Sequence, residues 1–181
     1  MKYLLVIDMQ NDFITGSLGT KEAEQIVDGV CKKIEACKKE GYHILATRDT
    51  HFENEDSEES RRYFSTQEGK KLPVLHCVKG TKGWEIEEHV QDKLGDARIF
   101  DKFTFGSEEL VAYMKEKKPD AIELVGLCTD ICVVSNAIML KAALPEIPIR
   151  VYKNCCAGVT PNSHEAALMT MSMCQIELME E

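Results

Sequence analysis

The segment VGLCTDICVVSNA, residues 125–137, contains two cysteines four residues apart, Cys128 and Cys132. With Thr129 as the N-cap of a helix that runs to about Ala143, Cys132 falls in the first turn, where exposed N–H groups and the helix dipole favour a thiolate. Cys128 ends the preceding strand and should be half-buried. An ordinary thiol, with a pKa of about 8.5, is mostly protonated at neutral pH and needs help to act as a nucleophile. Cys132 is therefore the candidate nucleophile.

Two charged residues could activate this thiol. Asp8 ends the apolar run YLLVID and could accept the thiol proton, whereas Lys102 closes a short strand and could place positive charge beside the thiolate. The same two residues could equally form an ordinary ion pair at a strand edge. A histidine partner, as in the cysteine proteases, would require His51 or His164 beside Cys132, and no local signature supports it.

A second group of residues has the pattern of a metal site. Asp49 and His51 alternate along extended chain, so their side chains point to the same side, and His76 could close the site from the end of a long loop. One carboxylate and two imidazoles suit Zn²⁺, Mn²⁺ or Fe²⁺, although histidines in a polar loop are often simply solvated. Glu68 is the candidate additional carboxylate ligand. The other acidic residues of this loop are expected to form a solvated surface: Glu53, Glu55, Asp56, Glu58 and Glu59.

Strands and helices alternate along the chain. Apolar runs and helical periodicity predict strands at 3–8, 42–49, 96–102, 121–127, 149–154 and 174–178, and helices at 21–40, 84–94, 108–118, 129–143 and 161–171. This alternation predicts an α/β protein with a three-layer α/β/α, Rossmann-like fold and a mostly parallel central sheet. In such sheets ligands bind beyond the carboxyl ends of the strands, where the residues singled out above would converge. Neither a GxGxxG nor a P-loop motif supports a nucleotide site.

The composition limits the class of protein. The 181 residues are 44% hydrophobic and carry a formal net charge of −9, which predicts one domain over residues 1–181 and disfavours nucleic-acid or membrane-surface partners. No apolar run reaches the roughly 18–20 residues of a membrane span, and the apolar start is too short for a signal peptide. Eight irregularly spaced cysteines then indicate reduced thiols in a cytoplasmic protein. Cys31, Cys37 and Cys174 are expected to pack as small core hydrophobes.

Three motifs together resemble the isochorismatase-like cysteine hydrolases, and within that superfamily the nicotinamidase/pyrazinamidase branch. LLVIDMQNDFITGSL is similar to the strand and loop that carry the catalytic aspartate, here Asp8, and DKFTFGS to the segment with the catalytic lysine, here Lys102. VGLCTDICV matches the nucleophile turn of the family, and this resemblance implies that Cys132 is the nucleophile. The resemblance also implies a cis peptide bond between Leu127 and Cys128, and an oxyanion hole formed by the backbone N–H groups of Cys128 and Cys132.

The segments RDTH and LPVLHCVKGTKGW are similar to the metal site of nicotinamidases. The resemblance implies Asp49, His51 and His76 as ligands of one divalent ion, with Zn²⁺ expected and Mn²⁺ or Fe²⁺ as alternatives. Metal-free branches of the superfamily generally lack this set. An additional histidine that many nicotinamidases carry is absent here, and Glu68 is a suggested substitute.

Three other positions concern the pocket. Phe13 matches an aromatic residue that lines the pocket in this branch, which favours a flat ring as substrate. Thr50 stands where an aromatic residue is common, and Trp84 stands where a small residue is usual. Because of these two departures, the resemblance does not determine the shape of the pocket.

The resemblance implies a metal-dependent cysteine amidohydrolase acting on a small carboxamide, with nicotinamide converted to nicotinate and ammonia through a thioester on Cys132. One alternative is a metal-independent hydrolase of the same superfamily acting on a ureido, carbamoyl or vinyl-ether substrate. The other is a non-catalytic thiol or metal-binding protein in which Cys128 and Cys132 form a redox pair or help to hold a structural metal. A homo-oligomer is compatible with the sequence, whereas nucleic-acid and membrane partners are not expected.

Overall fold

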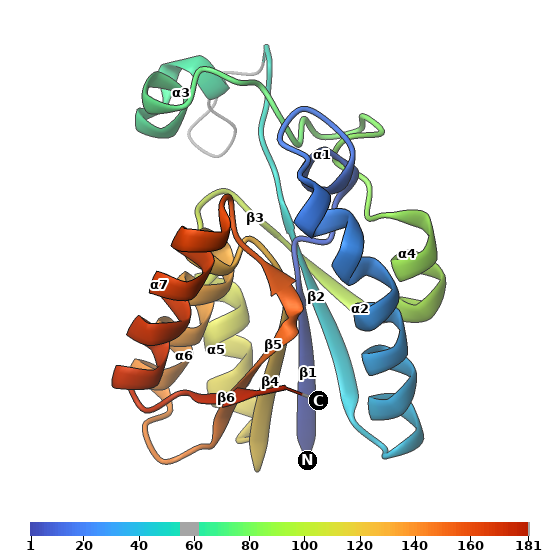
Figure 1. Ribbon diagram of the computed structural model, residues 1–181, viewed down its shortest axis with the longest axis vertical. Helices are drawn as coiled ribbons and strands as arrows, with labels where there is room; N and C mark the ends of the chain where they lie inside the picture. Colours follow the sequence, from blue (N-terminus) through green and yellow to red (C-terminus); the bar gives the residue numbers. More distant parts are fainter. Residues whose placement is uncertain (55–61, 181) are drawn as a thin grey trace.

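Six parallel strands form one sheet in the computed structural model, which describes residues 1–54 and 62–180. The strands are β1 (Lys2–Ile7), β2 (His43–Asp49), β3 (Arg98–Lys102), β4 (Ala121–Leu127), β5 (Ile149–Ala157) and β6 (Glu177–Met179). They lie side by side in the order β3-β2-β1-β4-β5-β6 (Figure 1). The α/β fold with a parallel central sheet that the sequence predicts is confirmed.

Helices cover both faces of this sheet (Figure 1). One face carries α2 (Lys21–Lys39) and α4 (Glu88–Leu94), and the other carries α5 (Glu108–Lys117), α6 (Val134–Ala143) and α7 (Pro161–Met173). Because both faces are covered, β1 is buried and apolar after its first two residues: Leu4 and Val6 pack toward α2, whereas Leu5 and Ile7 pack toward the other helices. The carboxyl ends of the strands are overlaid by α1 (Asn11–Ile14), a 3₁₀ turn (Tyr63–Ser65) and α3 (Gln67–Lys71).

The sequence of α2 explains how it lies on the sheet. Its first turn is capped by Thr20, whose hydroxyl accepts a hydrogen bond from the N–H of Ala23. Gly41, with φ of +79°, follows the last turn, as expected for a glycine helix stop. One face of this helix carries an apolar stripe that is buried against the sheet, including Ile26, Val30, Ile34 and Cys37.

The helix expected at 84–94 begins later, at Glu88. Before it, Trp84 and Glu85 lie in a turn, with their N–H groups donating to earlier carbonyls. The loop after β1 pairs with the next two residues: Gln10 forms an antiparallel bridge with Ile86, and the N–H of Glu87 donates to the carbonyl of Met9. A polar side chain then caps α4, since the Glu87 carboxylate accepts from the N–H of Val90. Tertiary pairing thus replaces the first turn of the predicted helix.

The last predicted strand also begins later. Helix α7 extends to Met173, Cys174 follows it as the C-cap, and β6 covers only Glu177–Met179. Cys174 is therefore exposed, and the expectation that it packs in the core is wrong, whereas Cys31 and Cys37 are buried as expected. Among the described residues, the helices are all too short or too polar to cross a bilayer.

Ser107 is the N-cap of α5, because its hydroxyl accepts from the N–H of Leu110 at 3.1 Å. We expect Ser107→Ala to lower the free energy of unfolding by about 1 kcal/mol, since one buried donor at the start of the helix loses its acceptor. Urea unfolding measures the change. Ser172→Ala, at an exposed position inside α7, is the matched control and should leave stability unchanged; equal stability of both variants would contradict this role for the cap.

Candidate active site

The order of the strands creates a crevice between β1 and β4. The chain runs outward from β1 through β2 to β3, and then from β4 through β5 to β6 on the other side. At such a reversal the connections leave in opposite directions and open a space beyond the carboxyl ends of the strands. Asp8 follows β1, Cys132 lies in the turn after β4, and Asp49 and Lys102 end β2 and β3.

The structure brings Asp8, Lys102 and Cys132 into contact. The Lys102 Nζ lies 2.7 Å from Oδ2 of Asp8 and 3.4 Å from Sγ of Cys132. It also lies 3.2 Å from Oδ1 of Asp49. All of these side chains are buried, so one ammonium group is shared between two carboxylates and a thiol, away from water.

Burial determines the charge of the two thiols. Desolvation raises the pKa of the Cys132 thiol well above its ordinary value, and the nearby Lys102 only partly opposes this. Burial likewise raises the pKa of Cys128 to about 12. Burial therefore opposes the thiolate that a helix start and a nearby lysine would favour. What distinguishes Cys132 from Cys128 is its contact with Lys102, beside Asp8.

Opposite causes act on the two charged partners. Burial lowers the pKa of Lys102, but attraction to Asp8, Cys132 and Asp49 outweighs it and holds this pKa well above the ordinary value. Burial raises the pKa of Asp8, even though Lys102 opposes the change. Asp8 is thus a better proton acceptor than a solvated aspartate. Its carboxylate and the Cys132 thiol both contact the ammonium group of Lys102.

The turn that carries the cysteines differs in part from its prediction. The cis peptide bond between Leu127 and Cys128 is present, as the resemblance implies. Thr129 is not an N-cap: a π-helical turn, Thr129–Val133, precedes α6, and the Thr129 hydroxyl is hydrogen-bonded to Nδ1 of His164 at 2.8 Å. The reason is that the side chain is buried against α7 and meets an imidazole there instead of its own helix N–H groups.

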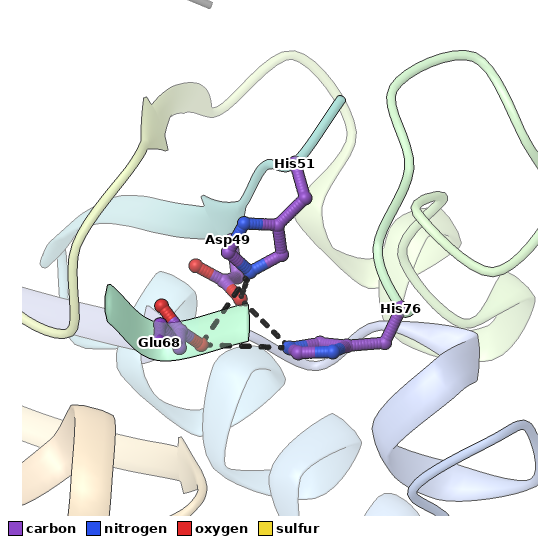
Figure 2. Close-up of side chains that lie close together, drawn as sticks. All are labelled: Asp49, His51, Glu68 and His76. Atoms are coloured by element: carbon purple, nitrogen blue, oxygen red, sulfur yellow. Dashed lines mark hydrogen bonds and ion pairs between the residues drawn. The ribbon is translucent and has the colours of Figure 1, made fainter. Parts of the chain in front are cut away.

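Four residues gather their ligand atoms beside this group. The candidate ligand atoms of Asp49, His51, Glu68 and His76 all lie within 4.8 Å of one another. Nε2 of His51 lies 2.9 Å from Oδ2 of Asp49, and Nε2 of His76 lies 3.6 Å from the same oxygen. Oε1 of Glu68 lies 3.6 Å from the His51 nitrogen and 3.8 Å from the His76 nitrogen. Figure 2 shows the four side chains converging on one point.

The chemistry of these donors fits a divalent ion. Two imidazole nitrogens and two carboxylate oxygens are ligands that Zn²⁺, Mn²⁺ and Fe²⁺ accept. The His76 Nδ1 lies 2.8 Å from the carbonyl oxygen of Val74, which can only accept a hydrogen bond, so Nε2 is the nitrogen left to face the group. This outer hydrogen bond is typical of a metal-binding histidine.

A cavity of about 690 Å³ joins the cysteine to the four-residue group. Cys132, Asp49, His51 and His76 line it, together with Phe13, whose ring centroid lies 5.6 Å from that of His76. Much of the remaining wall is apolar and includes Leu18, Leu72, Phe103, Phe105, Ile131 and Val159.

Comparison with known proteins assigns the family. The sequence model of the isochorismatase domain matches residues 2–180. The chain belongs to the isochorismatase family. It is 28% identical to the nicotinamidase of Saccharomyces cerevisiae over 76% of this chain and 80% of that protein. It is 26% identical to the nicotinamidase/pyrazinamidase of Mycobacterium tuberculosis over 98% of each.

A solved structure points to the same branch of the isochorismatase family. The pyrazinamidase of Pyrococcus horikoshii in complex with zinc has a TM-score of 0.80 and 26% sequence identity, and the match covers 99% of each chain. The resemblance that the motifs suggested is therefore confirmed. Together with the four converging donors, the match supports a divalent metal ion in this family member.

Two buried polar residues that the sequence analysis missed support the isochorismatase site. The Thr47 hydroxyl donates to Oδ1 of Asp8 at 2.7 Å. Gln10 holds the backbone of Asp49 on both sides: its carbonyl oxygen accepts from the N–H at 2.7 Å and its amide donates to the carbonyl at 2.8 Å. Thr47 could have been noticed, since it shares a face of β2 with Asp49.

The two unusual pocket positions contact each other. The Trp84 indole N–H donates to the Thr50 hydroxyl at 2.9 Å, and the Arg48 guanidinium lies 3.4 Å from the centroid of the Trp84 ring. Neither Trp84 nor Thr50 is among the described residues that line the cavity. They therefore hold the segment after β2 from outside rather than reshaping the pocket.

Alternatives in which Cys132 pairs with a histidine or with another thiol, and is not activated by Lys102 and Asp8, have less structural support. His164 bonds Thr129 and His51 bonds Asp49, so neither histidine is the hydrogen-bonding partner of Cys132 within the described part of the chain. All eight cysteines are free thiols. Of the acidic residues expected on the surface, Glu53 is exposed, whereas Glu55, Asp56, Glu58 and Glu59 lie outside the described residues.

Proposed function

We propose that this chain is a metal-dependent nicotinamidase, a cysteine amidohydrolase that converts nicotinamide and water to nicotinate and ammonia. The observation that carries the proposal is the position of the Cys132 thiol, which contacts Lys102 beside Asp8 and faces the same cavity as the four-residue metal group. The matches to nicotinamidases and pyrazinamidases at 26–28% identity support this choice of substrate.

The reaction begins with activation of the thiol. Asp8 takes the proton of Cys132 while Lys102 stabilises the thiolate. These roles follow from the contacts, because the Asp8 carboxylate and the Cys132 sulfur both touch the buried ammonium group of Lys102. The sulfur then attacks the carboxamide carbon: a C–S bond forms and the carbonyl π electrons move to oxygen. The backbone N–H groups of Cys128 and Cys132 are proposed to hold that oxyanion.

Collapse of the tetrahedral intermediate breaks the C–N bond. Asp8 gives its proton to the departing nitrogen, so that ammonia leaves and a thioester remains on Cys132. Asp8 next deprotonates a water molecule, whose oxygen attacks the thioester carbon. The C–S bond breaks, the acid product leaves, and the thiol regains its proton. Each proton transfer uses the same carboxylate, which is why its raised pKa suits the role.

Asp49, His51 and His76 would hold the metal ion, with Glu68 as a fourth ligand, and we propose zinc. When bound, the ion supplies a Lewis acid that can accept the lone pair of a ring nitrogen. Phe13 forms part of the wall beside His76 and offers a flat apolar surface to an aromatic ring.

The cavity wall favours an uncharged substrate. Lys71, at an exposed position, is the one lysine or arginine among the described residues that line the cavity, and Lys102 is already shared between two carboxylates. A substrate with carboxylate groups, such as an anionic vinyl ether or carbamoyl amino acid, would lack a buried cation to pair with. The cavity wall therefore supports hydrolysis of a neutral carboxamide over the metal-independent alternative, in which the substrate would be anionic.

We also propose that residues 1–181 form one hydrolase domain that works in the cytoplasm, where a free catalytic thiol stays reduced. Its partner is a small carboxamide. Assembly into a homo-oligomer is compatible with this proposal and is not required by it.

The proposal is tested by ammonia release from nicotinamide, pyrazinamide and several ureido compounds, with metal-loaded and chelator-treated protein. Cleavage of the ring carboxamides by the metal-loaded protein alone is expected. Cleavage of ureido compounds with or without chelator, and of no ring carboxamide, would support the metal-independent alternative instead.

Asp8→Asn should lower kcat for nicotinamide by about 10³-fold, because the amide cannot accept the thiol proton or return it to the leaving nitrogen. Steady-state kinetics measure the loss. Thr47→Val is the comparison: it removes one hydrogen bond to Asp8 and keeps the carboxylate, so it should cost far less. An Asp8→Asn variant with near-normal kcat would mean that another group accepts the proton.

A further inference from the structure

The nucleophile turn, Thr129–Val133, is fastened to the start of α7 by two consecutive residues. The Thr129 hydroxyl is hydrogen-bonded to Nδ1 of His164 at 2.8 Å. Next to it, both carboxylate oxygens of Asp130 accept from the N–H of Val159, at 3.1 and 3.2 Å. These contacts join the turn to the connection between β5 and α7 and to the first turns of α7 itself.

The first turns of α7, which carry His164, are themselves held in place by local hydrogen bonds. Thr160 and Ser163 form a reciprocal capping box at the first turn of α7, and the N–H of His164 donates to the carbonyl of Thr160 at 3.0 Å. Close packing adds to this, because a Cβ placed on Gly158 would lie only 2.9 Å from the Cβ of His164. The imidazole therefore starts from a defined point of the backbone.

The Thr129 hydroxyl lies in the same turn as the proposed nucleophile, Cys132. Thr129 is fully buried and lies between Cys128 and Cys132, whose backbone N–H groups are the proposed oxyanion donors. Without its imidazole partner the hydroxyl would be left unsatisfied in the interior, and the turn would have to shift to satisfy it. A displacement of about 1 Å in a catalytic arrangement can cost on the order of 10² in rate.

We propose that His164 is a positioning residue for catalysis: through Thr129 it fixes the orientation of the turn that carries Cys132 and the Cys128 N–H. The inference rests on the proposed cysteine chemistry and goes beyond it, since His164 does not touch the reacting atoms. Its effect should appear in kcat and not in KM, because the cavity wall that contacts the ring is left intact.

The test compares His164→Ala with His164→Asn, whose side-chain amide can place a nitrogen near the position of Nδ1. We expect His164→Ala to lower kcat for nicotinamide by about 10- to 100-fold with KM within about twofold. His164→Asn should restore most of kcat. Thr129→Val should reproduce the loss, and the double variant should be no slower than either single variant, because both remove one interaction.

Two further readouts make the result decisive. His89→Ala, on the exposed surface of α4, is the control and should behave as the unchanged protein. Alkylation of Cys132 by iodoacetamide needs no amide substrate, and we expect it to slow in His164→Ala and recover in His164→Asn, since the thiol moves relative to its proton acceptor. Thermal melting identifies the temperature range in which every variant is folded.

A folded His164→Ala variant with unchanged kcat and an unchanged alkylation rate would overturn the proposal and leave His164 a purely structural role. Losses that simply add in the double variant would also overturn it. If the unchanged protein releases no ammonia from nicotinamide, the proposed function fails separately, and the alkylation rates still decide the role of His164.

Discussion

Replacing Cys132 by alanine should abolish ammonia release from nicotinamide, with kcat lowered by at least about 10⁴-fold. The reason is that, within the described part of the chain, no other group in contact with Lys102 can form the thioester, since its remaining ion-pair partners are the carboxylates of Asp8 and Asp49. The sulfur is small and buried, so the variant should fold, and a thermal melt verifies this. Initial rates with metal-loaded protein measure the loss.

Two other cysteines serve as controls for this result. Cys174→Ala, at an exposed position after α7, should leave kcat unchanged. Cys128→Ala removes a thiol from the cavity wall and keeps the backbone N–H, so it should retain most of the activity. Equal losses in Cys128→Ala and Cys132→Ala would instead favour a pair of thiols acting together.

Removing the metal site should have the second largest effect. His51→Ala takes one of two imidazoles from the four-residue group, and we expect it to lose the bound ion and at least about 10²-fold in activity, because even loss of an outer-shell partner typically costs 10–100-fold. Metal content per chain, measured by mass spectrometry of the purified protein, should fall from about one to near zero. Chelator treatment of the unchanged protein should give the same loss, and added Zn²⁺ should reverse it.

A graded series sharpens this test. Glu68→Gln keeps the size of the side chain and should weaken metal binding less than His51→Ala, because Glu68 is the most exposed of the four. His89→Ala removes a histidine from the exposed surface of α4 and should change neither metal content nor rate. Full turnover by a metal-free His51→Ala variant would contradict the metal-dependent proposal and favour the alternative hydrolase.

Much of the fold and the positions of the main side chains could be predicted from the sequence, because both depend on simple rules. Parallel strands end at one edge of a sheet, so residues that end or follow apolar runs, such as Asp8, Asp49 and Lys102, must gather there. The apolar stripe of α2 likewise follows from helical periodicity. These patterns are local, and they need no knowledge of what packs against them.

Three of the misses have a common physical cause: each depends on a partner that is distant in the sequence. Thr129 has the residue type of an N-cap, yet its hydroxyl meets His164, 35 positions later. The predicted first turn of α4 is not helical, because the loop after β1 pairs with Ile86 and Glu87. Gln10 carries no motif at all, since it recognises only the backbone of Asp49.

The pKa of the Cys132 thiol could not be predicted from the sequence either. The position of Cys132 at the start of a helix favours a thiolate, but burial, which a sequence does not reveal at a single residue, raises its pKa. The consequence is mechanistic: the thiol must be deprotonated during the reaction, and Asp8, held beside it by Lys102, is the group placed to do so.

The central claim is a thioester on Cys132, and trapping it is the most direct test. The metal-loaded protein is mixed with nicotinamide labelled at the carboxamide carbon, quenched in acid within the first turnover, and digested for peptide mass spectrometry. We predict that the label is on the peptide containing Cys132, and that it is absent from Cys132→Ala and released by hydroxylamine. Product formation during the first turnover with no label on any peptide, or with label on a different residue, would contradict the mechanism.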